Sequence, residues 1–172
     1  GYQCYDGEVG TDHNESICLE SGGEWTDDAD CLSIECPPIG TPAVWYVDQN
    51  STNTPDGTSW ETAFLDVQDA LDVASSGNQI WIAQGWYVPT DTNGADDSRE
   101  ASFRLIAGVE IYGGFFGNET SLDQQEPDLY KVFFSGDLLG NDGEGGDTSD
   151  NAYHVVTADA LVGSSPVLDG VY

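Results

Sequence analysis

The chain has 172 residues, 38% of them hydrophobic, which is enough for one ordinary domain with a real core and a small additional module. Its 32 Asp and Glu residues outnumber 3 Lys and Arg residues, and the formal net charge of -29 excludes phosphate backbones and anionic membrane surfaces as partners. No apolar run approaches the roughly 20 residues that a membrane-spanning helix needs, so neither nucleic-acid binding nor a membrane span is expected.

The first predicted element is a small cysteine-rich module over residues 1–36. A segment this short cannot bury enough apolar surface to hold itself together, so two disulfides formed in an oxidising compartment are expected. Zinc is the rival, but the cysteine spacings lack the C-x-x-C pairs that zinc sites favour. Of the three possible connectivities, we favour Cys4 with Cys31 and Cys18 with Cys36.

A linker of sequence PPIGTPA follows at residues 37–43, because its prolines break both helices and strand ladders. The second domain is therefore expected over residues 44–172. Near its start, the stretch DVQDALDVA predicts one short amphipathic helix, with Val67, Leu71 and their neighbours on one buried face. Asp66 is the expected N-cap, and SSGN supplies the end of the helix.

The rest of the second domain reads as short strands. The strand-like runs are AVWYV, QIWIA, SFRLI, VEIYGGF, KVFFSG, YHVVTA and VLDGVY, while GWY is interpreted as an aromatic turn. Hairpins would favour tight two-residue turns, whereas these gaps are mostly longer and rich in Gly, Asp and Asn. The spacing therefore favours parallel coils.

A glycine-rich acidic loop, GDLLGNDGEGGDTSDN, is the candidate metal site. Hard oxygen ligands on a flexible loop suit calcium, although the pattern is not that of an EF-hand. The alternative is a solvated loop whose acids only keep water around the chain. The candidate calcium ligands are Asp137, Asn141, Asp142, Glu144, Asp147 and Asp150.

The sequence predicts no enzymatic activity. Arg104 is expected on the outer face of a strand, Lys131 at a strand entrance, and Arg99 in an acidic loop. His13 and His154 have no Ser or Cys partner nearby in the sequence, and no G-x-S-x-G elbow is present. These residue types are therefore interpreted as structural or exposed, and not as a catalytic set.

Two further surface features bear on glycans. The sequons NES, NST and NET make Asn14, Asn50 and Asn118 candidate N-glycosylation sites in predicted turns, although such short matches also arise by chance. Aromatic side chains near the helix could pack against the core or, where exposed, stack on sugar rings; packing is the favoured interpretation. These are Trp45, Trp60, Trp81, Trp86 and Tyr87.

The stretch from WYVDQNS to GWYVPT, with its DGTSW turn, helix and IWIA strand, resembles the N-terminal capping segment of right-handed parallel β-helix proteins of the pectate-lyase-like type. SFRLIAGVEIYGGFFGNETSLDQQEP and VFFSGDLLGND resemble the first coils of bacterial surface proteins in that group. The resemblance covers residues 44–172. It implies an all-β fold, a right-handed parallel β-helix whose open end is covered by an N-terminal capping α-helix.

The cysteine module has a resemblance of its own. Its DG turn, GGEW step and terminal cysteine are similar to a cysteine-rich repeat of secreted bacterial proteins, although two cysteines of that pattern are missing here. The whole chain is thus expected to be a disulfide-stapled module in front of the first coils of a parallel β-helix. This resemblance implies a secreted, extracellular or cell-surface location.

We therefore expect a non-enzymatic structural or cell-surface protein that acts in adhesion or extracellular filament assembly. The run VLDGVY resembles the start of a coil that continues in relatives, so either a longer chain or a second subunit is expected to cover that edge. The second case predicts a homopolymer built by end-to-end stacking or strand donation. The alternative is a β-helix that binds or cleaves an extracellular polysaccharide with a site on coils missing from this chain.

Overall fold

The computed structural model describes residues 3–5, 17–19, 43–143, 146–158 and 163–172. Backbone contacts divide the chain into two compact units, Gly1–Thr41 and Pro42–Tyr172. In the first unit, β1 (Gln3–Tyr5) pairs antiparallel with β2 (Ile17–Leu19), and their register places Cys4 directly opposite Cys18. Cys31 and Cys36 lie outside the described residues, as do His13 and Asn14.

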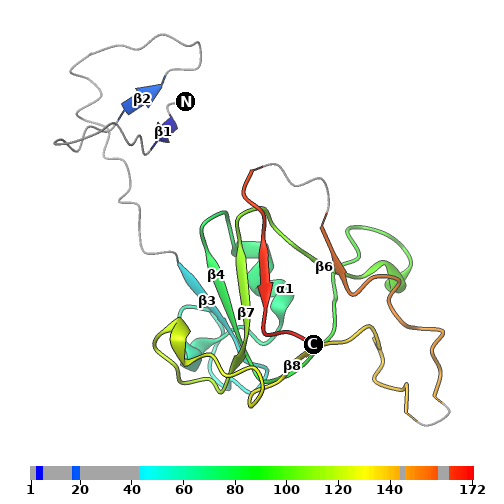
Figure 1. The fold of residues 1–172 in the computed structure, drawn as a ribbon. Helices are drawn as coiled ribbons and strands as arrows, with labels where there is room; N and C mark the ends of the chain where they lie inside the picture. Colours follow the sequence, from blue (N-terminus) through cyan, green and yellow to red (C-terminus); the bar gives the residue numbers. More distant parts are fainter. Residues whose placement is uncertain (1–2, 6–16, 20–42, 144–145, 159–162) are drawn as a thin grey trace. The chain divides into compact units, whose positions relative to one another are not determined.

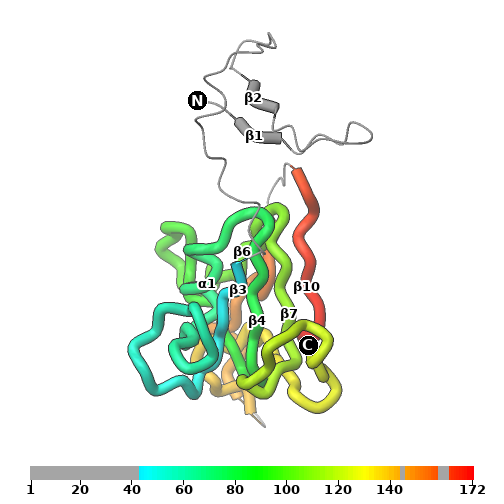
Figure 2. Tube along the Cα trace, turned by 90° about the vertical axis from the view of Figure 1, so that its left-hand side faces the viewer, coloured from blue at the N-terminus to red at the C-terminus, as the bar shows by residue number. Residues whose placement is uncertain are grey.

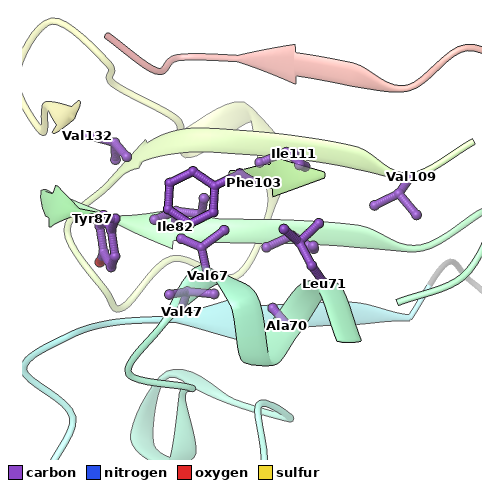
Figure 3. Close-up of a cluster of buried hydrophobic side chains, with 11 residues drawn as sticks. Val47, Val67, Ala70, Leu71, Ile82, Tyr87, Phe103, Val109, Ile111 and Val132 are labelled. Atoms are coloured by element: carbon purple, nitrogen blue, oxygen red, sulfur yellow. The ribbon is translucent and has the colours of Figure 1, made fainter. Parts of the chain in front are cut away.

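The helix predicted in the second unit is present as α1 (Val67–Val73). The carboxylate of Asp66 accepts a hydrogen bond from the backbone N–H of Gln68 at 2.9 Å, so the predicted N-cap is confirmed. Val67 and Leu71 are buried on the face that the helical spacing predicted. Figure 3 shows this face of α1 directed at the strands, which explains why the helix forms: its apolar stripe completes a core.

The main sheet of the second unit is parallel throughout and has four strands in the order β10-β7-β4-β3 (Figure 1). Figure 2 shows β10 along one edge of this sheet, beside β7. The strands are β3 (Val44–Val47), β4 (Gln79–Ala83), β7 (Glu110–Phe115) and β10 (Val167–Asp169).

Two smaller parallel pairs complete the strands. β5 (Gly85–Tyr87) pairs with β8 (Val132–Phe134), and β6 (Phe103–Arg104) pairs with β9 (Val156–Thr157). The chain passes from the main sheet to β5 and then β6, and later from the main sheet to β8 and then β9. The parallel pairing expected from the long gaps is confirmed, whereas GWY is a strand and not a turn.

The expected fold class, an all-β right-handed parallel β-helix, is wrong. The described residues form a mixed structure in which α1 and three 3-10 helices accompany small separate parallel sheets. The physical reason is that the Gly-, Asp- and Pro-rich connections take up much of the chain, so that SFRLI and YHVVTA each supply only a two-residue strand. The 3-10 helices are η2 (Trp60–Thr62), η3 (Ser98–Glu100) and η4 (Leu122–Gln124).

The core lies between α1 and the main sheet. Alternate side chains of the strands face it, so Ile80 and Ile82 of β4 and Ile111 of β7 are fully buried there. Phe103 of β6 and Val132 of β8 close the core from the smaller sheets (Figure 3). The intervening residues of these strands consequently form the other face of the main sheet.

Candidate interaction surface

One edge of the main sheet is closed by the chain itself. Along the outer side of β3, the backbone N–H of Tyr46 donates to the carbonyl of Gly57, and the N–H of Phe64 donates to the carbonyl of Tyr46, both at 2.9 Å. The N–H of Asp48 then donates to the carbonyl of Phe64 at 2.9 Å. The segment from Gly57 to Phe64 thus satisfies backbone groups that an edge strand would otherwise present to another chain.

The opposite edge is open within the described part of the chain, where β10 pairs only with β7. The N–H of Val167 donates inward to the carbonyl of Val109 at 3.1 Å. Because the backbone groups of successive strand residues point to alternate sides, the N–H and C=O of Leu168 point to the open side. The Val167 and Leu168 side chains are 36% and 39% exposed. We call Val167, Leu168, Asp169 and the exposed Tyr172 the edge surface.

The outer face of the main sheet beside this edge is acidic. Glu110 Oε2 accepts hydrogen bonds from Gln79 Nε2 at 2.8 Å and from the Tyr112 hydroxyl at 3.2 Å. Asp169 is the register partner of Tyr112 on the neighbouring strand. Burial, and then the negative charges of Glu110 and Asp169, raise the pKa of the Tyr112 phenol. Both carboxylates therefore lie beside the same phenol, since Glu110 accepts its hydrogen bond and Asp169 is the register partner of Tyr112.

A row of aromatic rings crosses the two-stranded sheet of β5 and β8 and ends at Tyr172 of the edge surface. Trp86 of β5 stacks on Phe133 of β8 with ring centroids 4.4 Å apart, and the Tyr172 ring follows 5.8 Å from Phe133. Lys131 Nζ lies 5.1 Å from the centroid of the Tyr172 ring. Trp86 is 65% exposed, so this aromatic row, defined by Trp86, Phe133 and Tyr172, presents a ring to solvent.

The other candidate aromatic residues mostly pack. Trp81 is only 4% exposed, stacks on Phe115 at 4.9 Å and donates its indole N–H to Gln79. Trp60 donates its indole N–H to the carbonyl of Glu119 at 2.9 Å and so anchors the turn that contains it. The packing interpretation therefore holds for these rings. Trp86 is the exception, and its contact with Phe133 carried no sequence signal because the two residues are far apart in the chain.

The acidic loop uses its first carboxylate to hold its own backbone. The Oδ1 and Oδ2 atoms of Asp137 accept hydrogen bonds from the N–H groups of Asn141 and Asp142, each at 3.0 Å. The hydrogen bond from Asp142, and then that from Asn141, lowers the pKa of the Asp137 carboxyl. Asp137 is therefore satisfied as a turn-forming residue, which reduces its capacity to bind a cation.

The remaining predicted calcium ligands make separate local contacts. Asp142 accepts from the Asn151 side chain at 2.7 Å, Asp147 from the Ser149 N–H at 2.9 Å, and Asp150 from the Leu139 N–H at 3.2 Å. Glu144 lies outside the described residues.

Two side-chain oxygens near the end of this loop have no hydrogen-bond partner. Asp150 Oδ1 and Asn151 Oδ1 are buried without a hydrogen-bond partner, which is a donor set that a hard cation can satisfy. Nevertheless, the described residues contain no group of three or more His, Cys, Asp or Glu side chains that could hold a metal ion. Calcium at this loop therefore stays a prediction.

The basic residues have structural contacts. Arg99 Nε donates to the carbonyl of Asn151 at 2.8 Å, with its guanidinium 4.3 Å from the centroid of the Tyr153 ring, and Arg104 Nε lies 3.9 Å from Asp91 Oδ2. Each of the two therefore contacts a loop of its own unit.

The surface positions that the sequence singled out are reached by solvent. His154 is exposed, as are the candidate sequon residues Asn50 and Asn118.

In the part of the chain that the structure describes, no helix has the length and apolar character to cross a bilayer.

Comparison of the chain with protein-family models, with curated proteins and with solved structures gives no match.

Proposed function

We propose that this chain is a non-enzymatic, secreted structural or cell-surface protein that adheres to a partner through its edge surface. The observation that carries the proposal is the open side of β10, where the backbone N–H and C=O of Leu168 point away from β7 and the side chains of Val167 and Leu168 are partly exposed. An edge of this kind accepts a further strand, because main-chain hydrogen bonds provide affinity whatever the partner's sequence.

The difference between the two sheet edges bears on how the protein assembles. A head-to-tail filament built by edge pairing needs an open edge at both ends of the sheet. The β3 edge is already paired with the segment Gly57–Phe64, whereas the β10 edge is open in the described chain. The asymmetry favours adhesion to another molecule over filament assembly by edge pairing. Homopolymer formation stays a prediction. Measuring the molecular mass of the native protein in solution tests it.

The experiment compares two substitutions at one position of β10. Leu168→Pro removes the outward N–H donor, while Leu168→Ala keeps that donor and removes only the side chain. Labelled protein is added to cells of the source species, and the amount retained on their surface is measured after washing. Leu168→Pro is expected to abolish retention, and Leu168→Ala to weaken it. Equal retention of Leu168→Pro and the parent protein, with equal melting temperatures, would contradict the proposal.

The aromatic row supports a second candidate function, binding of an extracellular polysaccharide. The observation in its favour is the 65% exposure of the Trp86 ring at one end of the row, since exposed aromatic faces stack on sugar rings. Soluble polysaccharides should then change the tryptophan fluorescence of the parent protein, with a smaller change in Trp86→Ala. The same mixtures, incubated with calcium, are monitored in the ultraviolet for unsaturated products. Their appearance would contradict a non-enzymatic role.

A further inference from the structure

We propose that the partner of the edge surface is an extended, basic peptide segment in which Lys or Arg residues alternate with apolar residues. The inference deepens the proposed adhesion and rests on it, because it names what kind of strand β10 receives. It comes from two properties of the same edge: the direction of its free backbone groups and the charge of the face beside it.

The backbone geometry defines the shape of the partner. Leu168 directs its N–H and C=O away from β7, so an incoming strand can bond to both groups only if it is extended alongside β10. A helix has no free backbone groups to offer there, because they are used within the helix. The partner segment must therefore be extended.

The pleat of the sheet defines the alternation of the partner's side chains. In an added strand, residues beside Val167 and Asp169 face the outer side of the sheet, and the residue beside Leu168 faces the core side. On the outer side they meet the acidic region formed by Glu110 and Asp169 around Tyr112. On the core side, the partner's residue meets Leu168. Leu168 is the register partner of the buried Ile111 and lies on the same face of the sheet. Basic residues therefore suit one side and apolar residues the other.

Charge also decides between this partner and a second copy of the chain. A second copy brings its own formal net charge of -29, with only 3 Lys and Arg residues to offset 32 acidic ones. Its β10 would place another Asp169 near the same acidic region. A basic segment is instead attracted over a distance comparable with the Debye length, which speeds its encounter with the edge.

The probe is a synthetic peptide of alternating lysine and valine, titrated into the full chain labelled with nitrogen-15. A matched peptide with glutamate in place of lysine is the charge control, and a lysine–valine peptide with N-methylated alternate amides is the backbone control. Binding is expected to shift the amide resonances of Leu168 and Asp169 first. Both control peptides are expected to bind at least about tenfold more weakly.

Variants of the chain separate charge from backbone pairing. Asp169→Asn is expected to weaken binding of the lysine–valine peptide about fivefold and to strengthen binding of the glutamate peptide, because it removes one negative charge from the edge. Leu168→Pro is expected to weaken binding of the lysine–valine peptide about fivefold or more. Raising the salt concentration from about 0.05 to about 0.5 M should weaken the parent complex and affect Asp169→Asn less. Melting temperatures of the variants establish that they are folded.

Three results would overturn the inference. Equal affinity for the lysine and glutamate peptides would remove the charge argument. Self-association that the peptide does not disrupt would assign the edge to a second copy. A Leu168 amide already protected before the peptide is added would assign it to another part of the chain.

The peptide titration and the cell-retention experiment can fail separately. If the peptide fails to bind while Leu168→Pro still abolishes retention on cells, the proposed adhesion survives and only the basic partner is wrong. If the peptide binds at β10 while Leu168→Pro leaves retention on cells unchanged, the edge accepts a basic strand but does not mediate the adhesion, and the proposed function is wrong.

Discussion

The carboxylate of Glu119 lies against the backbone of Phe116, where Glu119 Oε1 accepts the Phe116 N–H at 2.8 Å. Its Oε2 atom accepts the N–H groups of Gly117 and Asn118 at 3.0 and 2.9 Å, in a turn where Gly117 has a φ of 115°. The Glu119 side chain is only 7% exposed. A buried carboxylate therefore organises the turn that follows β7 through backbone N–H groups alone.

Acid is expected to loosen this turn. Burial of Glu119 would by itself raise the pKa, but the backbone hydrogen bonds from Phe116, Gly117 and Asn118 outweigh it and hold the pKa below 4.5. The stabilisation is thus complete above about pH 4.5 and is lost as the pH falls through the lower folded-state pKa. Glu119→Gln should lower the free energy of unfolding by about 2 kcal/mol at neutral pH. The measurement is denaturant unfolding between about pH 2 and pH 7.

The control for this prediction is Glu100→Gln, which removes the same charge from an exposed position. Its unfolding free energy should follow that of the parent across the pH range. If Glu119→Gln has the same pH dependence as the parent, its carboxylate is not the acid-sensitive group.

Leu71 tests the packing of α1. Leu71→Asp should abolish cooperative unfolding, because a charge buried beside Val67 and Ala70 has no partner there. Leu71→Ala should cost about 2 to 5 kcal/mol through the cavity it leaves. Val73→Asp puts the same charge on an exposed position of the same helix, and thermal unfolding should change little. Identical melting of Leu71→Asp and the parent would show that α1 does not complete the core.

Calcium binding at the acidic loop predicts a higher melting temperature in calcium than in chelator. Asp150→Asn should abolish the increase, since Asp150 Oδ1 is a buried oxygen that a bound cation would satisfy. Asp123→Asn, which removes the same charge from an exposed position of η4 outside the acidic loop, is the matched control. The same melting temperature with and without calcium in the parent protein would remove the site.

The disulfide pairing expected from sequence stays a prediction, and the register of β1 and β2 favours an alternative to it. Directly opposite residues of antiparallel strands have Cα atoms about 4.5 to 5.5 Å apart, within the range that a disulfide spans. Cys4 opposite Cys18 therefore predicts a bond between these two, which leaves Cys31 for Cys36. Peptide mapping of unreduced native protein checks it. Recovery of a Cys4–Cys31 peptide would restore the pairing favoured from sequence.

Local patterns in the sequence identified the elements that local chemistry determines. The helix was predictable because Asp66 caps it and because Val67, Ala70 and Leu71 recur at helical spacing. QIWIA was predictable as a strand, and β4 matches it residue for residue. These features depend on residues that are close together in the sequence.

Features that depend on distant contacts were not predictable. The stacking of Trp86 on Phe133 depends on the register of two strands far apart in the chain. The hydrogen bonds that Asp137 accepts within its own turn depend on the loop conformation. The all-β expectation failed for a related reason: apolar runs show where a strand can form, but the ladder partners decide how many of their residues pair.

The exchange rate of the Leu168 amide hydrogen in the full-length native protein tests the proposed open edge most directly. Measured residue by residue with nitrogen-15 labelled protein, the Leu168 amide should exchange far faster than the Val167 amide, which donates inward to the Val109 carbonyl. It should slow when the protein is bound to its partner. A Leu168 amide as protected as that of Val167 in the free protein would contradict the account, because the edge would then already be occupied.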